Sequence, residues 1–191
     1  MQKPQSMFQS LEITSRHFPR MRYRCPSCAE IHQGFPALAY NLPDAIFQLS
    51  AEDREQRAVV SSDLCILDDE RYFIRCVLVV AVNGYEEEFE YGPWVEVNAE
   101  DFSRYSVWFN LGASPGWRSI EGRLANALPT SNPTTLGIRC MVELPDDEDN
   151  RPFVRVSDTS HPLFDEQANG MAITRATGLI AQLKGYVLIV D

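Results

Sequence analysis

The fold of this chain is decided by residues 71–97, which read RYFIRCVLVVAVNGYEEEFEYGPWVEV. Residues 71–82 are rich in β-branched side chains and favour a strand over a helix. Asn83-Gly84 is the strongest short hairpin signal in the chain, because Gly supplies the positive φ of a tight turn. Residues 86–97 return as an alternating strand, which Gly92-Pro93 interrupts in the manner of a bulge or a sheet edge. We therefore predict two adjacent antiparallel strands here.

Further strand and helix signals flank this hairpin on both sides. Strands are predicted at residues 62–67, 116–124, 136–144, 151–156 and 186–190, and helices at 50–57, 98–108, 160–170 and 174–184. Ser50 and Asn98 are expected N-caps, and Pro162 suits the first turn of its helix. The pattern predicts an α+β fold: a mainly antiparallel twisted sheet with flanking helices and an N-terminal CxxC knuckle.

The length of 191 residues fits one domain, or one domain with an appendage. Residues 1–24 are polar and basic and are expected to form a basic leader, whereas residues 25–191 form a single α+β domain with the knuckle at 25–32. With 45% hydrophobic residues the chain can build a sizeable core. Its large aromatic residues are expected to fill that core rather than to line a groove: Trp94, Phe102, Tyr105, Trp108 and Trp117.

Charge and cysteine content narrow the function classes. The chain has 17 Lys and Arg against 27 Asp and Glu, a formal charge of -10. Such a balance disfavours nucleic-acid and membrane-surface roles and favours a basic protein partner. The five cysteines are an odd number, and Cys76 and Cys140 lie in apolar strand-like runs, so we expect reduced thiols and a cytoplasmic location. No apolar run approaches the roughly 20 residues of a membrane span.

Cys25-Pro-Ser-Cys28, followed by His32, has the residue types of a metal site. Two thiolates and an imidazole suit Zn²⁺, and four protein ligands would make a closed structural site. Cys65 is the expected fourth ligand. The alternative is a pair of reduced thiols at a turn with His32 on the surface, because one CxxC supplies only half of a tetrahedral shell.

Five polar residues form a second candidate set: Asp63, Arg75, His161, Glu166 and Gln167. Asp63 and Arg75 would meet as an architectural ion pair if their strands are adjacent. His161 precedes a helix that begins with proline, where it would cap or brace the turn. The functional alternative is a general base or a ligand contact, because a histidine titrates near neutral pH.

Several motifs occur in an order that resembles one bacterial family. They are Cys25-Pro-Ser-Cys28 with His32, Ser62-Asp63-Leu64-Cys65, Phe73-Ile74-Arg75, and His161-Pro162-Leu163 with Glu166-Gln167 and Gly170. Over roughly residues 25–175 the chain is similar to the domain of unknown function 2199 family. That family usually has Gly where this chain has Ala29, and often has Gly where it has Cys76. Gly adopts positive φ freely, and Ala does so at a cost. The resemblance implies one domain and no particular activity.

No complete catalytic motif stands in the sequence: a nucleophile elbow and a phosphate-binding loop are both missing. The leading hypothesis is a non-enzymatic protein-binding or regulatory module with a structural zinc knuckle. A second hypothesis is an immunity-type protein that neutralises a basic toxin. A third is a small enzyme centred on Asp63, Arg75 and His161, and a pocket joining these three side chains would favour it.

Overall fold

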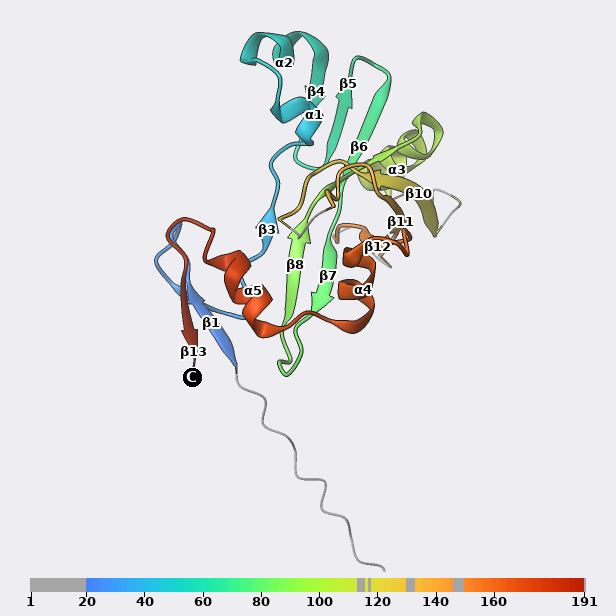
Figure 1. Cartoon of the computed structure of the whole chain (residues 1–191). Helices are drawn as coiled ribbons and strands as arrows, with labels where there is room; N and C mark the ends of the chain where they lie inside the picture. Colours follow the sequence, from blue (N-terminus) through green and yellow to red (C-terminus); the bar gives the residue numbers. More distant parts are fainter. Residues whose placement is uncertain (1–19, 113–115, 117, 130–132, 146–149, 191) are drawn as a thin grey trace, which may run out of the picture.

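The structure is a computed structural model, and it describes residues 20–112, 116, 118–129, 133–145 and 150–190 (Figure 1). The fold is α+β, as predicted, with three sheets and five helices among the described residues. No helix in these ranges is long and apolar enough to cross a membrane.

Seven antiparallel strands form the largest sheet, in the order β12-β11-β10-β9-β6-β5-β4. Their bounds are β4 Ala58–Val60, β5 Leu64–Leu67, β6 Arg71–Arg75, β9 Trp94–Val97, β10 Ser119–Leu124, β11 Arg139–Glu143 and β12 Phe153–Val156. Burial alternates along β10, β11 and β12, as expected for strands with one face on the core.

The described residues form two further sheets of three strands each. One has the order β3-β8-β7, with bounds β3 Leu38–Ala39, β8 Glu88–Gly92 and β7 Leu78–Ala81. The other has the order β13-β1-β2, with bounds β13 Val187–Val190, β1 Met21–Arg24 and β2 Ile31–Gln33. The second sheet brings the described N-terminal segment beside the C-terminal strand (Figure 1).

The predicted hairpin is confirmed, although each of its strands breaks in two. β7 pairs antiparallel with β8, and β6 pairs antiparallel with β9. Pro93, which has no N–H, separates β8 from β9. The turn differs from a two-residue type I′ loop, which needs positive φ at both central residues. Gly84 has φ +87, whereas Asn83 does not lie in the positive region, and Tyr85 N–H closes the turn onto Val82 O at 3.0 Å.

The chain between β6 and β7 also contacts the far end of the large sheet. Val77 N–H donates to Pro152 O at 2.9 Å, and Val154 N–H donates to Val77 O at 2.8 Å. A strand at one end of the sheet order, β12, therefore hydrogen-bonds back to the chain that leaves a central strand. The large sheet therefore bends far enough for β12 to reach the chain after β6.

Five helices flank the sheets: α1 Asp44–Phe47, α2 Ala51–Arg57, α3 Ala99–Leu111, α4 Pro162–Asn169 and α5 Ile173–Ile180. The predicted N-caps are confirmed, because Ser50 accepts from Asp53 N–H and Asn98 accepts from Asp101 N–H. In Figure 1, α1 and α2 lie beside β4 and β5, and α4 lies beside β7 and β12.

The core holds most of the aromatic residues that the sequence placed there. Trp94 and Tyr105 are fully buried, and Phe102 and Trp108 are nearly so; Trp117 lies outside the described residues. Phe102, Tyr105 and Trp108 are spaced by three residues along α3, and this spacing gives the helix one buried face. A smaller cluster, which includes Trp94 and Phe73, packs beneath α1 around Ile46.

The predicted boundary of the leader at residue 24 is too late. Met21–Arg24 form β1, the central strand of its sheet, and Met21 is fully buried. The reason is that Met21 supplies an apolar side chain to the main core, so this part of the basic segment is folded with the domain. Residues 1–19 lie outside the described residues.

Candidate metal centre

Cys25 and Cys28 lie on the tight connection between β1 and β2, and His32 lies in β2 itself. Cys25 N–H donates to Glu30 O, and Ala29 N–H donates to Cys25 O, each at 2.9 Å. Ala29 has φ 63, in the left-handed region. This is the position where the resembled family usually has Gly. The knuckle keeps its tight turn with Ala, and Ala29 adopts positive φ at a conformational cost.

Cys25, Cys28 and His32 come together. Their potential ligand atoms all lie within 4.8 Å of one another, and Cys28 Sγ lies 3.1 Å from His32 Nε2. Two ligand atoms on one tetrahedral zinc ion are roughly 3.5–3.8 Å apart, given Zn–S of about 2.3 Å and Zn–N of about 2.0 Å. Small side-chain rotations would therefore place all three atoms on one ion.

The backbone of the knuckle stabilises the thiolate form of Cys25. The pKa of Cys25 is lowered, first by the backbone hydrogen bond from Cys28 and then by that from Ser27. Thiolate, rather than thiol, is the form of cysteine that ligates a metal. The same backbone N–H groups therefore favour the form of Cys25 that a metal ion would require.

Two aromatic rings and one glycine support the knuckle from the side. The ring of Tyr23 stacks on His32, with centroids 5.3 Å apart, and its other neighbour is Tyr186, at 5.7 Å. Gly185 has φ +84, and a Cβ at this position would lie 2.9 Å from Pro26 Cβ. The turn before β13 therefore packs directly on the CxxC loop.

Cys65 does not belong to this group, and its prediction as the fourth ligand is wrong. It lies in β5 of the large sheet, buried against Ile46 and Phe73, whereas the knuckle belongs to the β13-β1-β2 sheet. Burial raises the pKa of Cys65 to about 12, so this residue is a protonated core thiol. Among the described Cys, His, Asp and Glu residues, three and no more form the metal-ligand group.

Asp63 forms its ion pair with Arg151, and the predicted pair with Arg75 is wrong. Arg151 Nε donates to Asp63 Oδ1 at 2.6 Å, and Ser62 Oγ donates to Asp63 Oδ2 at 2.6 Å. Arg151 precedes β12, and the link between β12 and Val77 brings it beside the start of β5. Sequence reasoning missed Arg151 because no local signal connects residues so far apart in the chain.

Arg75 approaches Asp63 through the backbone instead. Arg75 N–H donates to Asp63 O at 2.9 Å, and its Nη1 donates to Ser62 O at 3.2 Å. Its guanidinium carbon lies 6.0 Å from the centroid of a Trp94 ring. The side chain therefore covers the smaller core cluster and holds the chain before β5.

His161 is the N-cap of α4, as predicted. Its Nδ1 accepts from Leu163 N–H at 3.1 Å, so the ring proton resides on Nε2, which lies 3.1 Å from Pro133 O. The side chain is buried. Both ring nitrogens have backbone partners, and this arrangement leaves neither available as a general base or a metal ligand.

Glu166 and Gln167 also have architectural partners. Glu166 Oε1 accepts from Arg175 Nε at 2.9 Å, which ties α4 to α5. Gln167 Nε2 donates to Val154 O at 2.7 Å, and Val156 N–H donates to Gln167 Oε1 at 2.8 Å. The predicted polar set is therefore dispersed: among the described residues, no hydrogen bond or ion pair joins His161, Glu166 or Gln167 to Asp63 or Arg75.

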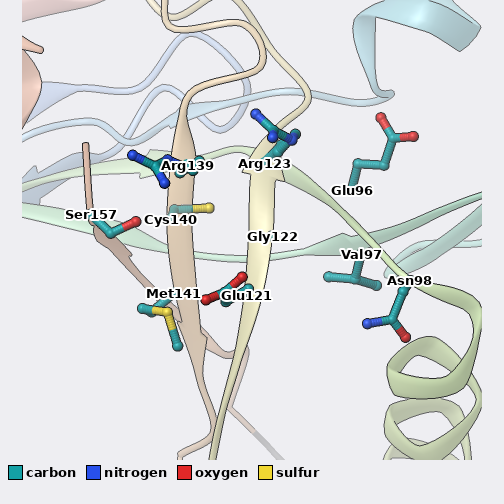
Figure 2. Close-up of a pocket in the computed structure, with 10 residues that line it drawn as sticks. All are labelled: Glu96, Val97, Asn98, Glu121, Gly122, Arg123, Arg139, Cys140, Met141 and Ser157. Atoms are coloured by element: carbon teal, nitrogen blue, oxygen red, sulfur yellow. The ribbon is translucent and has the colours of Figure 1, made fainter.

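A cavity of about 520 Å³ lies on the large sheet, where β10 diverges from the end of β9. Figure 2 shows side chains from β9, β10 and β11 around it, with Arg123 and Arg139 at one end and Glu121 at the other. Gly122 is required here because a Cβ would collide with Val95. This site has no local signal in the sequence, since its residues become neighbours only through strand register.

Comparison with known proteins yields a family and no characterised relative. No curated protein and no solved structure matches the chain. A family model described as "Uncharacterized protein conserved in bacteria" matches residues 24–171, which is most of the chain and includes the knuckle and α4. The chain therefore belongs to this uncharacterised bacterial family, DUF2199.

Proposed function

We propose that this protein binds one zinc ion through Cys25, Cys28 and His32, and that it acts as a protein-binding module of the bacterial cytoplasm. The convergence of the three ligand atoms within 4.8 Å carries the metal assignment. Thiolate and imidazole ligands suit zinc, whereas calcium and magnesium prefer oxygen ligands.

The zinc ion has a structural role in this proposal. It would link the turn after β1 to β2, and so would close a loop of eight residues, 25–32. A metal that binds only the folded state adds its binding free energy to folding. Because β1 lies between β2 and β13, the same ion would stabilise the pairing of the C-terminal strand. A water molecule or a group of a partner protein would complete the tetrahedron.

The proposed partner is a basic protein. The formal charge of -10 repels nucleic acid and anionic lipid, and it attracts a positively charged protein surface. A basic toxin neutralised by an immunity-type protein is one partner of this class. The enzyme alternative has less support, because the side-chain hydrogen bonds of Asp63, Arg75 and His161 go to backbone or to other side chains rather than to one another. Nε of Arg75 is buried without a hydrogen-bond partner among the described residues.

Cobalt substitution tests the ligand set. Co²⁺ bound tetrahedrally by thiolates absorbs strongly in the visible range, so titration of the reduced apoprotein reports the site directly. We expect saturation at one Co²⁺ per chain, competition by Zn²⁺, and loss of the absorbance in Cys25→Ser, Cys28→Ser and His32→Ala.

Cys65→Ala is the matched control for these variants. It removes a cysteine that lies in the core, so the cobalt spectrum and stoichiometry should not change. Loss of the thiolate absorbance in Cys65→Ala with an unchanged circular dichroism spectrum would contradict the three-ligand assignment. Retention of the absorbance in both Cys25→Ser and Cys28→Ser would contradict the site itself.

Affinity purification from a bacterial lysate tests the partner class. Capture of a basic protein should weaken between about 0.1 and 1 M salt, because the Debye length falls from about 10 to 3 Å. Capture that is insensitive to salt, or recovery of nucleic acid in place of protein, would count against the proposal.

A further inference from the structure

We propose that the outer face of the large sheet holds a binding site for a small anion, centred on Arg123 of β10 and Arg139 of β11. The site is the cavity of about 520 Å³ shown in Figure 2. It lies on a different sheet from the knuckle, and it does not depend on the zinc proposal.

The two arginines are direct cross-strand partners in the register of β10 and β11. Direct partners project from the same face of a sheet, with Cβ atoms about 4.5–5.5 Å apart, and like charges in this arrangement are destabilising. Figure 2 places both side chains at the same end of the cavity. An anion bound between them would relieve this repulsion.

The nearby carboxylates are largely committed to other partners. Glu96 faces Arg123 across the strands, but Arg71 holds it through two hydrogen bonds of 2.8 and 2.6 Å. Asp158 lies near Arg139, but it accepts two hydrogen bonds from Ser160. Among the described residues, neither Arg123 nor Arg139 forms an ion pair.

The remaining donors of the site are aligned in one row across the sheet. Arg123 donates from Nη1 to Gly137 O at 3.0 Å, and this contact leaves its other N–H groups for a ligand. Ser157 lies beside Arg139, whose carbonyl accepts from Ser157 N–H, and it lines the same cavity. The two guanidinium groups therefore border one end of the site, and Ser157 lines it beside Arg139.

The geometry specifies the class of ligand. Guanidinium groups bind carboxylate or phosphate oxygens in pairs, and the cavity has the volume of a small-molecule site. Glu121 lies at the opposite end, so a polyanion is disfavoured. The ligand is therefore a small molecule with a single carboxylate or phosphate group and a neutral or cationic remainder.

Isothermal titration at constant ionic strength tests this site, with inorganic phosphate and acetate as separate probes and chloride as the reference salt. We expect saturable binding of at least one probe, and an affinity lower by tenfold or more in both Arg123→Gln and Arg139→Gln. Binding of phosphate alone assigns a phosphate-bearing ligand, and binding of acetate alone assigns a carboxylate. Arg139→Lys, which keeps the charge without the planar group, should weaken binding less than Arg139→Gln.

Arg155→Gln is the matched control, because Arg155 lies on the neighbouring strand β12 and is already paired with Glu143. Its affinity for the probe should equal that of the parent. Without anion, Arg139→Gln should melt at the same temperature as the parent or higher, since it removes a like-charge contact. The proposal would be overturned if neither probe showed saturable binding, or if Arg155→Gln lost as much affinity as the Arg123 and Arg139 variants.

Discussion

Arg151 Nε lies 2.6 Å from Asp63 Oδ1, and this ion pair joins segments that are 88 residues apart in the sequence. Asp63 precedes β5 and Arg151 precedes β12, so the pair connects two strands that are far apart in the order of the large sheet. Asp63 is nearly buried, whereas Arg151 is close to half exposed. The contact therefore links the start of β5 to the start of β12.

Asp63→Asn should lower the free energy of unfolding by about 1–3 kcal/mol at pH 7. The neutral amide cannot accept from both Ser62 Oγ and Arg151 Nε as the carboxylate does. Burial raises the pKa of Asp63, but the hydrogen bonds from Ser62 and Arg151 outweigh it, and the net pKa is lowered. A lowered folded-state pKa adds stability above the unfolded value of about 3.9, and this stability is lost as the pH falls through the folded-state pKa.

Urea unfolding from pH 7 to pH 2.5 checks this prediction. The difference between the parent and Asp63→Asn should stay constant down to about pH 5 and shrink below about pH 4. Arg151→Ala combined with Asp63→Asn should be less than additive. The control is Arg155→Ala, whose pair with Glu143 is exposed and should contribute under about 1 kcal/mol. A pH-independent difference would exclude an ionised Asp63 as its source.

His161→Ala should cost about 1 kcal/mol or more of stability, because it removes the acceptor for Leu163 N–H at the start of α4 and the donor to Pro133 O. His161→Asn restores a capping side chain and should recover part of the loss. Denaturant midpoints of the three proteins at pH 7 give the comparison. Equal stability of His161→Ala and the parent would refute the capping role.

Ala29→Gly should stabilise the protein by about 0.5–1 kcal/mol, because φ at this position is positive and Gly adopts it without a steric penalty. Thermal unfolding of the reduced protein measures the effect. Ala37→Gly, at a residue without positive φ, is the control and should give no gain. A loss of stability in Ala29→Gly would show that the turn of the knuckle does not adopt this conformation.

Gln167→Glu should cost roughly 1–3 kcal/mol at pH 7, because it replaces the donor to Val154 O with an acceptor and leaves that carbonyl unpaired. Amide hydrogen exchange would show faster exchange in β12 than in β6. Gln182→Glu is the control, since Gln182 also donates through its amide but lies at an exposed position. Equal protection of β12 in Gln167→Glu and the parent would contradict the bracing role.

The sequence predicted those features that depend on a few neighbouring residues. The caps at Ser50, Asn98 and His161 follow from side chains that reach two or three residues along the chain. The grouping of Cys25 with Cys28 follows from their spacing on one turn. The same turn joins β1 to β2, and it brings His32 of β2 within reach of both sulfurs.

The predictions that failed concern contacts that depend on the order of the strands. Asp63 and Cys65 are close in sequence, yet Asp63 pairs with a residue near β12, and Cys65 turns into the core beneath α1. Neither outcome follows from local pattern, because both require the order of the strands. The Arg123 and Arg139 cavity likewise requires the register of β10 on β11. Hydrophobic alternation identifies strands but does not identify their partners.

Elemental analysis of the purified protein tests the central claim most directly. The protein should be produced under reducing conditions, because both thiols must be free to bind. It should not be exposed to a chelator, which would remove the metal. We predict one zinc per chain, removed by Cys25→Ser and retained in Cys65→Ala. A zinc content well under one per chain in the unmutated protein would contradict the assignment of Cys25, Cys28 and His32 as a metal centre.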